Sequence, residues 1–248
     1  MLPLKDSPKT WRTPWVNLTL IAINVLAFLY ELALGPRLDL FLSRWAVIPA
    51  EVSAVLRDAP GAHPAVLITL ITAMFLHGGW LHLGGNMLFL WIFGDNVEDA
   101  MGHVRYLVFY LVGGLCAAAA QIASAPLSMV PMLGASGAIS AVLAAYVFLY
   151  PRSPITVLNP IPLLWLFWGL FLIFPAWLVI GLFFVVNLWD ALTVSTEGGV
   201  AFMAHVGGFV GGAVLYRLFL LGRERLEDYG RHDQWVRPRR PPRRVDYY

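Results

Sequence analysis

Long runs of apolar residues, separated by short polar stretches, dominate the pattern of this chain. Crossing a bilayer as a helix takes about 20 mostly apolar residues, and six segments reach or approach that length. They are residues 15–34, 80–95, 104–123, 135–150, 170–190 and 200–221. The second and fourth are short for a full span. The pattern predicts an all-α membrane protein, built as a bundle of six transmembrane helices.

Other apolar stretches lie between the predicted spans. Residues 65–76 lead into the second span, and we expect them near the membrane interface or inside the protein. Residues 157–174 are also apolar, but prolines interrupt their helical pattern. We therefore predict that they form a hydrophobic approach to the fifth helix, with a seventh span as the alternative. The connection over 36–64 is long enough to have a structure or function of its own.

Composition supports a membrane protein. Hydrophobic residues make up 59% of the chain and charged residues 13%, whereas a soluble domain is about one quarter charged. The single cysteine, Cys116, excludes an internal disulfide and a cysteine-rich metal site. The first apolar run begins only after Pro14 and is too long for a signal peptide, so we expect it to be a retained helix.

Basic residues gather near both ends of the chain, which predicts the topology. Lys5, Lys9 and Arg12 precede the first span, and arginines from Arg217 to Arg244 crowd the tail. Positive residues favour the cytoplasmic side, so both termini are predicted to be cytoplasmic. Two ends on one side require an even number of spans, which fits six and not seven.

Three regions follow from this topology. Residues 1–14 are predicted to be a cytoplasmic segment, 15–221 the membrane domain, and 222–248 a basic, disordered cytoplasmic tail. The tail is expected to contact anionic lipid and not nucleic acid. Without an evident organelle-targeting segment, the compact bundle is expected in a prokaryotic plasma membrane.

Strongly polar residues inside a span are costly, so each is a candidate for function. The candidates are His77, His82, Asn86, Ser136, Ser140 and His205. The predicted topology places four of them in the outer half of the bilayer at similar depth: His82, Asn86, Ser136 and His205. Glu31 and Asp190 are assigned to span ends.

Ser136 lies between two glycines at the predicted start of the fourth helix, in the sequence Gly134-Ala135-Ser136-Gly137. Glycine permits close approach and positive φ, and a helix N-terminus offers unpaired N–H groups. These are features that would stabilise an oxyanion beside a nucleophile. The motif alone also occurs where membrane helices simply pack together.

His205 is followed by Gly207, Gly208, Gly211 and Gly212, so one face of the sixth helix is flat. The fourth helix is small-faced as well. If the two faces meet, His205 Nε2 comes within hydrogen-bond reach of the serine hydroxyl and can act as a general base. A packing histidine is the alternative. No acidic residue lies at that depth, which favours a dyad over a Ser-His-Asp triad.

His82 and Asn86 are four residues apart and share one helix face. Each can donate a hydrogen bond to a developing oxyanion, and losing one such donor typically costs about 10²–10³ in kcat. The alternative is a hydrogen bond between helices. His77 is expected to be structural.

Three segments together resemble the rhomboid family of intramembrane serine proteases. They are FLHGGWLHLGGNMLFLWIFGDNVED (75–99), LGASGAI (133–139) and AHVGGFVGG (204–212), and the resemblance covers roughly residues 14–221. It implies a six-helix rhomboid-like bundle that needs no cofactor or metal. Its substrates would be transmembrane proteins cleaved near the outer membrane surface. Ser140 departs from some bacterial members, which have tyrosine there, against the histidine ring.

The resemblance also implies a role for each site residue. These are Ser136 as nucleophile, His205 as base, His82 and Asn86 as oxyanion donors, and Gly134 and Gly137 as the glycines beside the nucleophile. Residues 160–180 are expected to form a lateral wall that admits the substrate helix.

Two other classes of function stay open. One is a non-enzymatic protein that binds membrane clients in the same groove. The other is a transporter with His77, His82 and His205 as a proton relay, which the lack of a mid-membrane acid disfavours. The absence of H-E-x-x-H and of paired aspartates disfavours zinc and aspartyl proteases. Oligomeric state, physiological substrate and cleavage preference do not follow from the sequence.

Overall fold

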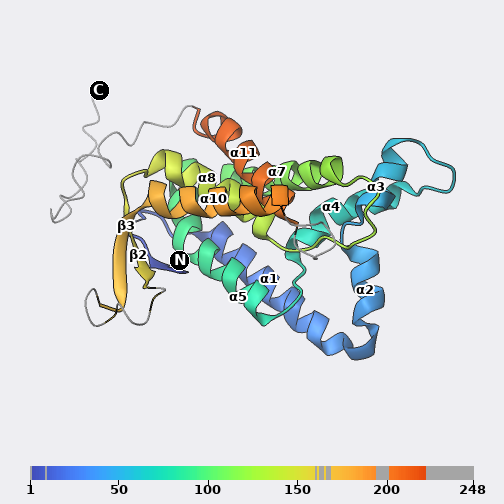
Figure 1. Cartoon of the computed structure of the whole chain (residues 1–248), viewed down its shortest axis with the longest axis horizontal. Coiled ribbons are helices and arrows are strands. Elements are labelled where there is room, and N and C mark those ends of the chain that lie inside the picture. The colour runs from blue at the N-terminus through green and yellow to red at the C-terminus, as the bar shows by residue number, and fades with distance from the viewer. Residues whose placement is uncertain are drawn as a thin grey trace, which may run out of the picture.

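A computed structural model describes residues 2–8, 10–159, 161, 165, 169–193 and 201–221. The predicted tail, residues 222–248, and part of the 157–174 stretch lie outside these ranges. Within them the protein is mostly helical (Figure 1). The helices are α1 (Trp15–Leu34), α2 (Leu38–Trp45), α3 (Pro49–Leu56), α4 (Thr69–Thr72), α5 (Trp80–Phe89), α6 (Asp95–Met101), α7 (His103–Ser124), α8 (Ser136–Leu149), α10 (Ala176–Thr193) and α11 (Phe202–Phe219).

Four helical stretches are long and apolar enough to cross a membrane among the described residues: Trp15–Trp45, His103–Ser124, Ala176–Thr193 and Phe202–Phe219. A bent pair, Pro64–Phe75 with Trp80–Met101, makes a fifth if it is counted as one span. Helix α8 is apolar but shorter, at 14 residues. The prediction of a helical membrane protein is confirmed, and the structure supports four to five spans by length with α8 as a short additional helix.

Helix α5 continues without a break through a π-helical turn, η4 (Leu90–Gly94), into α6. The second predicted span therefore extends to Met101, beyond its predicted end at 95. The apolar stretch before it does not form one long helix. It consists of η2 (Pro64–Ile68), α4 and η3 (Ala73–Phe75), and it meets α5 at an angle of 79°.

A small sheet was not predicted. Strand β2 (Pro154–Leu158) pairs antiparallel with β3 (Phe171–Pro175) and, on its other side, with β1 (Leu2–Lys5). The helix predicted over 170–190 therefore begins only at Ala176, because residues 171–175 belong to β3. Ile155 and Val157 alternate with more exposed residues along β2 and are fully buried. That alternation and β-branching favour a strand.

Both ends of the membrane domain lie at the end of the bundle that holds the sheet. Glu98 Oε1 and Oε2 accept hydrogen bonds from the backbone N–H groups of Val16 and Asn17, at 3.0 and 2.7 Å, which places the start of α1 beside α6. Arg105 Nη1 donates to the carbonyl of Leu221 at 2.7 Å, just beyond α11. Residues 15 and 221 therefore share one end, as an even number of crossings requires. Which side of the membrane that end faces stays a prediction.

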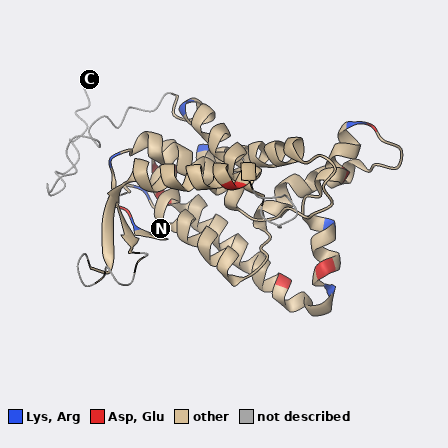
Figure 2. Cartoon of the chain, viewed as in Figure 1, with Lys and Arg blue, Asp and Glu red and all other residues tan. Residues whose placement is uncertain are grey.

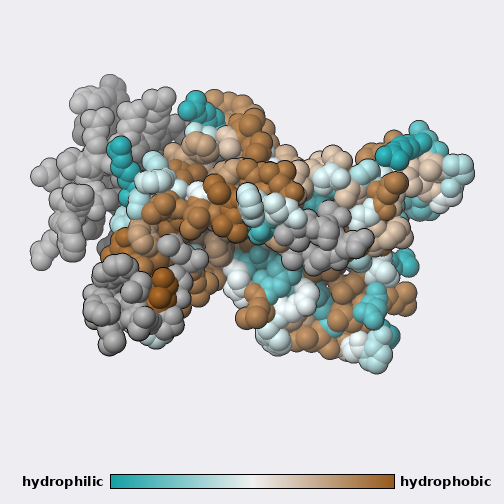
Figure 3. Space-filling view, viewed as in Figure 1, coloured by the Kyte–Doolittle hydropathy of each residue, from teal (hydrophilic) through white to brown (hydrophobic). Residues whose placement is uncertain are grey.

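The exterior fits a lipid environment. Lys, Arg, Asp and Glu are sparse along the long helices and concentrate near the ends of the molecule (Figure 2). Hydrophobic side chains cover much of the visible surface of these helices, whereas hydrophilic ones collect at the end with α2 and α3 (Figure 3). Large apolar side chains on the helices are exposed, among them Leu81 of α5, Trp189 of α10 and Val214 of α11. Exposed apolar side chains are expected where a helix faces lipid.

Helix α8 lies at the centre of the bundle. Ten consecutive residues, from Gly137 to Tyr146, are buried, and α7 and α11 pack against it and against each other. A Cβ added at Gly212 would lie 2.5 Å from the Ala141 Cα, and one at Gly208 would collide with the Gly137 carbonyl oxygen. The small faces predicted on these helices therefore meet at a distance that only glycine permits.

Replacing Gly208 with alanine is expected to destabilise the bundle by about 1–3 kcal/mol, because the new methyl group meets a backbone oxygen that cannot move aside. Gly181→Ala in α10 is the matched control, since a Cβ there meets nothing within 4 Å. Thermal unfolding in detergent measures the difference. Equal melting temperatures for the two variants would contradict the close contact of α8 with α11.

At the sheet end, Asp6 inserts between helices. Its Oδ2 accepts hydrogen bonds from Asn96 Nδ2 and from the Tyr146 hydroxyl, each at 2.7 Å. Burial raises the pKa of Asp6 from 3.8 to about 7, against the opposing effect of the Tyr146 hydrogen bond, and the charge of Asp95 raises it further. The folded protein therefore holds this proton at pH values where the unfolded chain has released it.

Stability is expected to fall as the pH rises from about 4 through about 7, because deprotonating Asp6 costs more in the folded state than in the unfolded one. Asp6→Asn keeps an acceptor oxygen for both hydrogen bonds but carries no proton to lose. It should flatten this pH dependence by at least about 1 kcal/mol, the value of one pKa unit. Melting temperatures of the two proteins across this range test the effect, and parallel curves would contradict it.

Candidate active site

The loop over residues 125–135 leads into α8 and positions Ser136, the first residue of that helix. The backbones of Val47 and Met132 exchange two hydrogen bonds, at 2.9 and 2.7 Å. Two residues further on, the Gly134 N–H donates to the Ala73 carbonyl at 2.8 Å. The loop is thus attached to two separate segments directly before α8 begins. Gly134 has φ +123°, a conformation that favours glycine.

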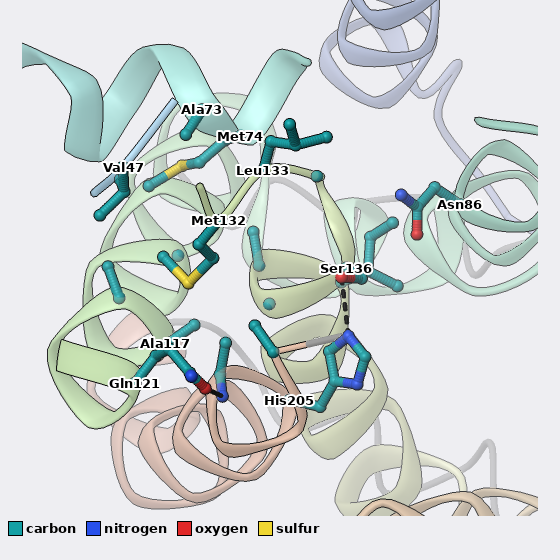
Figure 4. A pocket seen from close by; sticks show the side chains of 18 of the residues that line it. Val47, Ala73, Met74, Asn86, Ala117, Gln121, Met132, Leu133, Ser136 and His205 are labelled. Atoms are coloured by element: carbon teal, nitrogen blue, oxygen red, sulfur yellow. Dashed lines mark hydrogen bonds between the residues drawn. The ribbon is translucent and has the colours of Figure 1, made fainter. Parts of the chain in front are cut away.

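Ser136 and His205 are in contact. His205 Nε2 lies 2.8 Å from Ser136 Oγ, as the dashed line in Figure 4 shows. The two residues come from α8 and α11, whose small faces pack together, so the contact predicted from the glycine pattern is present. Both side chains are half-buried. Because the backbones of the two helices cannot separate without losing this packing, the distance between serine and histidine is set by the fold.

On its other side, His205 Nδ1 hydrogen-bonds to Asn187 Oδ1 of α10. Within the described residues, Ser136 and Asn187 are the hydrogen-bond partners of this imidazole. Phe183 and Phe202 lie near the ring, with centroids 6.3 and 6.4 Å away. Aromatic rings thus come from α10 and from the start of α11. Ser140 donates its hydroxyl to the Ser136 carbonyl at 2.8 Å.

His82 lies against the serine loop. A Cβ added at Gly134 would lie 2.6 Å from His82 Nε2 and 3.7 Å from Ser136 Oγ. Both atoms therefore lie close to Gly134, on the side where a side chain would point. The Gly78 N–H donates to His82 Nδ1 at 3.3 Å. An imidazole nitrogen that accepts from an N–H carries no hydrogen, so the neutral ring has its hydrogen on Nε2. That donor faces the serine loop.

Asn86 is one turn further along α5 and is buried. Its Nδ2 lies 3.0 Å from His77 Nε2. An amide nitrogen has two hydrogens, so one bonds to His77 and the other is left for the cavity that Asn86, Ser136 and His205 line together. Figure 4 shows Asn86 at the rim of that cavity on the side of Ser136.

Glu31 supports this region from α1. It is 1% exposed, and its carboxylate accepts from the His77 N–H at 3.2 Å. The sequence interpretation of Glu31 as a span-end residue missed this role, because its partner, the His77 backbone, is 46 residues away in sequence. The expectation that His77 is structural agrees with its contacts with Glu31 and Asn86.

A single cavity of about 620 Å³ joins the site residues. The six residues to which the family resemblance assigns a role all line it: His82, Asn86, Gly134, Ser136, Gly137 and His205. One arm of the cavity is apolar, with Val47, Met74 and Met132 along it (Figure 4). Ser136 is the first residue of α8, and no side chain caps this N-terminus. Its first N–H groups therefore lack intrahelical partners and add donors to the site.

The prediction of a lateral wall from residues 160–180 is wrong for the described residues 169–175. These lie in or beside β3, at the end of the bundle away from Ser136. Within the described part of the chain, α10 approaches the site only further along, through Phe183 and Asn187. Asn187 was missed from the sequence, although it is a strongly polar residue inside the predicted fifth span, and the same polarity rule would have singled it out.

The described ranges contain no group of three or more His, Cys, Asp or Glu side chains placed to hold a metal ion. The chemistry that the site itself offers comes from a hydroxyl bonded to a neutral imidazole, with N–H donors around it. This arrangement suits nucleophilic acyl transfer.

Comparisons with known proteins agree with this geometry. Residues 64–222 match the family model described as the Rhomboid domain. The chain is 29% identical over 211 residues to Rhomboid protein 1, mitochondrial, of Saccharomyces cerevisiae, covering 81% of this chain and 52% of that protein. It is 31% identical over 177 residues to RHOMBOID-like protein 12, mitochondrial, of Arabidopsis thaliana, covering 64% and 48%.

A bacterial relative is similar over more of its length. Rhomboid protease AarA of Providencia stuartii is 25% identical over 224 residues, which cover 83% of this chain and 73% of that protein. The chain spans about half the length of the two mitochondrial relatives. These relatives include both mitochondrial and bacterial proteins. The Rhomboid domain model covers well over half of the chain and includes all six predicted site residues, so the chain belongs to the rhomboid family.

Proposed function

We propose that this protein is an intramembrane serine endopeptidase that cleaves transmembrane segments of other membrane proteins through Ser136 and His205. The observation that carries the proposal is the 2.8 Å hydrogen bond between His205 Nε2 and Ser136 Oγ, inside a cavity among membrane-spanning helices. The similarity to AarA, a protein named a rhomboid protease, supports it.

In the proposed reaction, Ser136 Oγ attacks the scissile carbonyl carbon while His205 Nε2 takes the hydroxyl proton. The C–N bond then breaks, and His205 returns the proton to the leaving amine. Water attacks the acyl ester in the second half, again with His205 as base. The ester bond to Ser136 Oγ then breaks, His205 returns the proton to that oxygen, and the new carboxyl group is released.

The carbonyl oxygen becomes negative in each tetrahedral intermediate. His82 Nε2–H and the free Asn86 Nδ2 hydrogen are the proposed side-chain donors, beside the N–H groups at the start of α8. Gly134 and Gly137 are proposed to permit the close approaches that this requires. Gly134 leaves room for His82, and a Cβ at Gly137 would lie only 2.5 Å from the Ala117 Cβ. Donors fixed in this way need no reorganisation as charge develops.

The bilayer and transmembrane protein segments are the proposed partners, with no nucleic acid and no cofactor. Ser136 begins α8 at the end of the bundle away from the sheet, so water would enter from that side. The predicted topology, with cytoplasmic termini in a prokaryotic plasma membrane, makes it the outer side. A substrate helix must unwind to present its carbonyl, so helix-breaking residues near the cut are expected to help.

Ser136→Ala and His205→Ala are each expected to abolish labelling by a fluorophosphonate probe. They should also reduce cleavage of a transmembrane substrate by about 10⁴-fold or more, because members of a Ser–His pair act as a unit. Purified protein in liposomes, checked for folding by thermal unfolding, is the sample.

Ser124→Ala and His63→Ala are the matched controls, since both residues are exposed and lie outside the cavity lining. They should label like the wild type. If the folded wild type and Ser136→Ala label alike, the protease proposal fails and binding of membrane clients without cleavage becomes the better account.

Gly134→Ala is expected to lower cleavage by about 10²-fold, the usual cost of displacing a reacting group by about 1 Å. Its new Cβ would lie 2.6 Å from His82 Nε2, at a φ of +123° that alanine rarely adopts. Gly84→Ala in α5 is the control, because a Cβ there meets nothing within 4 Å. Cleavage rates of both variants measure the loss of activity, and their melting temperatures show whether the proteins are still folded. Equal activity would refute the proposed role of Gly134.

A further inference from the structure

Asn187 is an uncharged polar side chain held inside a membrane-spanning helix. It belongs to α10 and is only 9% exposed. Both ends of its amide have partners: Oδ1 contacts His205 Nδ1, and Nδ2 donates to the Phe183 carbonyl at 2.8 Å. A buried amide without partners would cost several kcal/mol in lipid. These two bonds account for its presence in an apolar helix.

The bond to Phe183 determines which way the amide faces. A backbone carbonyl only accepts hydrogen bonds, so the group that faces it must be the NH₂. The reverse orientation would set Asn187 Oδ1 against the Phe183 oxygen, so that two acceptors would face each other with no hydrogen between them. Asn187 Oδ1 must therefore face the imidazole of His205.

This orientation fixes the tautomer of the histidine. Asn187 Oδ1 has no hydrogen to donate, so the hydrogen of the pair sits on His205 Nδ1. In the neutral ring, Nε2 then carries the lone pair, and Nε2 is the atom that lies 2.8 Å from Ser136 Oγ. The serine hydroxyl donates to Nε2, which is the arrangement a general base needs.

We infer that Asn187 is a positioning residue for His205, so that Phe183 carbonyl, Asn187, His205 and Ser136 form one directed chain of hydrogen bonds. This inference rests on the proposed protease function and extends the dyad by a third, neutral member. Asn187 takes the place that a carboxylate holds in a Ser-His-Asp triad. An amide orients the ring without bringing a second charge into a buried site within the membrane, where a charge is costly.

Asn187→Leu tests the inference, with Asn24→Leu as the matched control. Asn24 is also a buried asparagine in a spanning helix, and its Nδ2 donates to the carbonyl four residues earlier, Leu20, at 2.7 Å. The control thus loses the same local bond, away from the cavity. Asn187→Leu should lower kcat for a transmembrane substrate by about 10- to 100-fold, the usual cost of losing the group that orients a functional histidine. KM should change by no more than about twofold, since Asn187 contacts His205 and not the cavity.

Asn187→Asp gives a second readout, which a merely structural role would not move. It keeps an acceptor oxygen for Nδ1 but adds a charge that favours the protonated imidazole. Activity should exceed that of Asn187→Leu, and the acidic limb of the pH–kcat profile should move to higher pH. The inference is overturned if Asn187→Leu loses no more kcat than Asn24→Leu, or if the Asp variant keeps the wild-type profile.

Ring ¹⁵N chemical shifts of His205, assigned by difference with His205→Ala, separate this inference from the proposed function. The wild type should show a protonated Nδ1 and an unprotonated Nε2, and Asn187→Leu should lose that preference. This measurement needs no activity. If the wild type proves inert but shows the expected tautomer, the protease proposal fails and the hydrogen-bond chain stands. A protonated Nε2 would overturn the inference even in an active enzyme.

Discussion

The close contact of α8 with α11 is the constraint on which the rest of the structure depends. Helices in lipid gain little from hydrophobic burial and associate through close packing instead. Here the packing is so tight that a methyl group on Gly208 would collide with the Gly137 carbonyl. Gly137 directly follows Ser136, and Gly208 lies three residues beyond His205. The same contact that holds the bundle together therefore sets the distance between hydroxyl and imidazole.

Polar groups in the bundle gain their orientation from the need for partners. An unsatisfied donor or acceptor in the bilayer costs several kcal/mol, so the site side chains are bonded on the side away from the cavity. His82 accepts from Gly78, Asn86 bonds to His77, and His205 bonds to Asn187. His82 Nε2, the second hydrogen of Asn86 Nδ2 and His205 Nε2 are then left for the site. The hydrogen bonds that satisfy these polar groups inside the membrane are thus the same ones that orient the side chains of the site.

The two ends of the bundle have different roles: one anchors the N-terminal segment, and the other contains the candidate site. The sheet end contains ionisable groups buried against each other, with Asp6 bonded to Asn96 and Tyr146, and Glu98 bonded to the start of α1. These contacts anchor the N-terminal segment to the helices. The opposite end carries Ser136, the loop before it and the cavity. Stability that depends on pH at one end is thereby separated from the chemistry proposed at the other.

Local pattern alone determined the helical membrane class, the approximate helix positions, and the candidates Ser136, His205, His82 and Asn86, because apolar length and polar residues within it are visible in one dimension. The sheet escaped prediction, since β2 needs partners more than ten residues away in sequence. The structure shows the partners of Asn187 and Glu31, the ring of His205 and the backbone of His77, which lie in other segments of the chain. Tertiary structure decided which nitrogen of His205 faces Ser136, because contacts of α11 with α10 and α8 place Asn187 on one side of the ring and the serine on the other, and no sequence spacing encodes them.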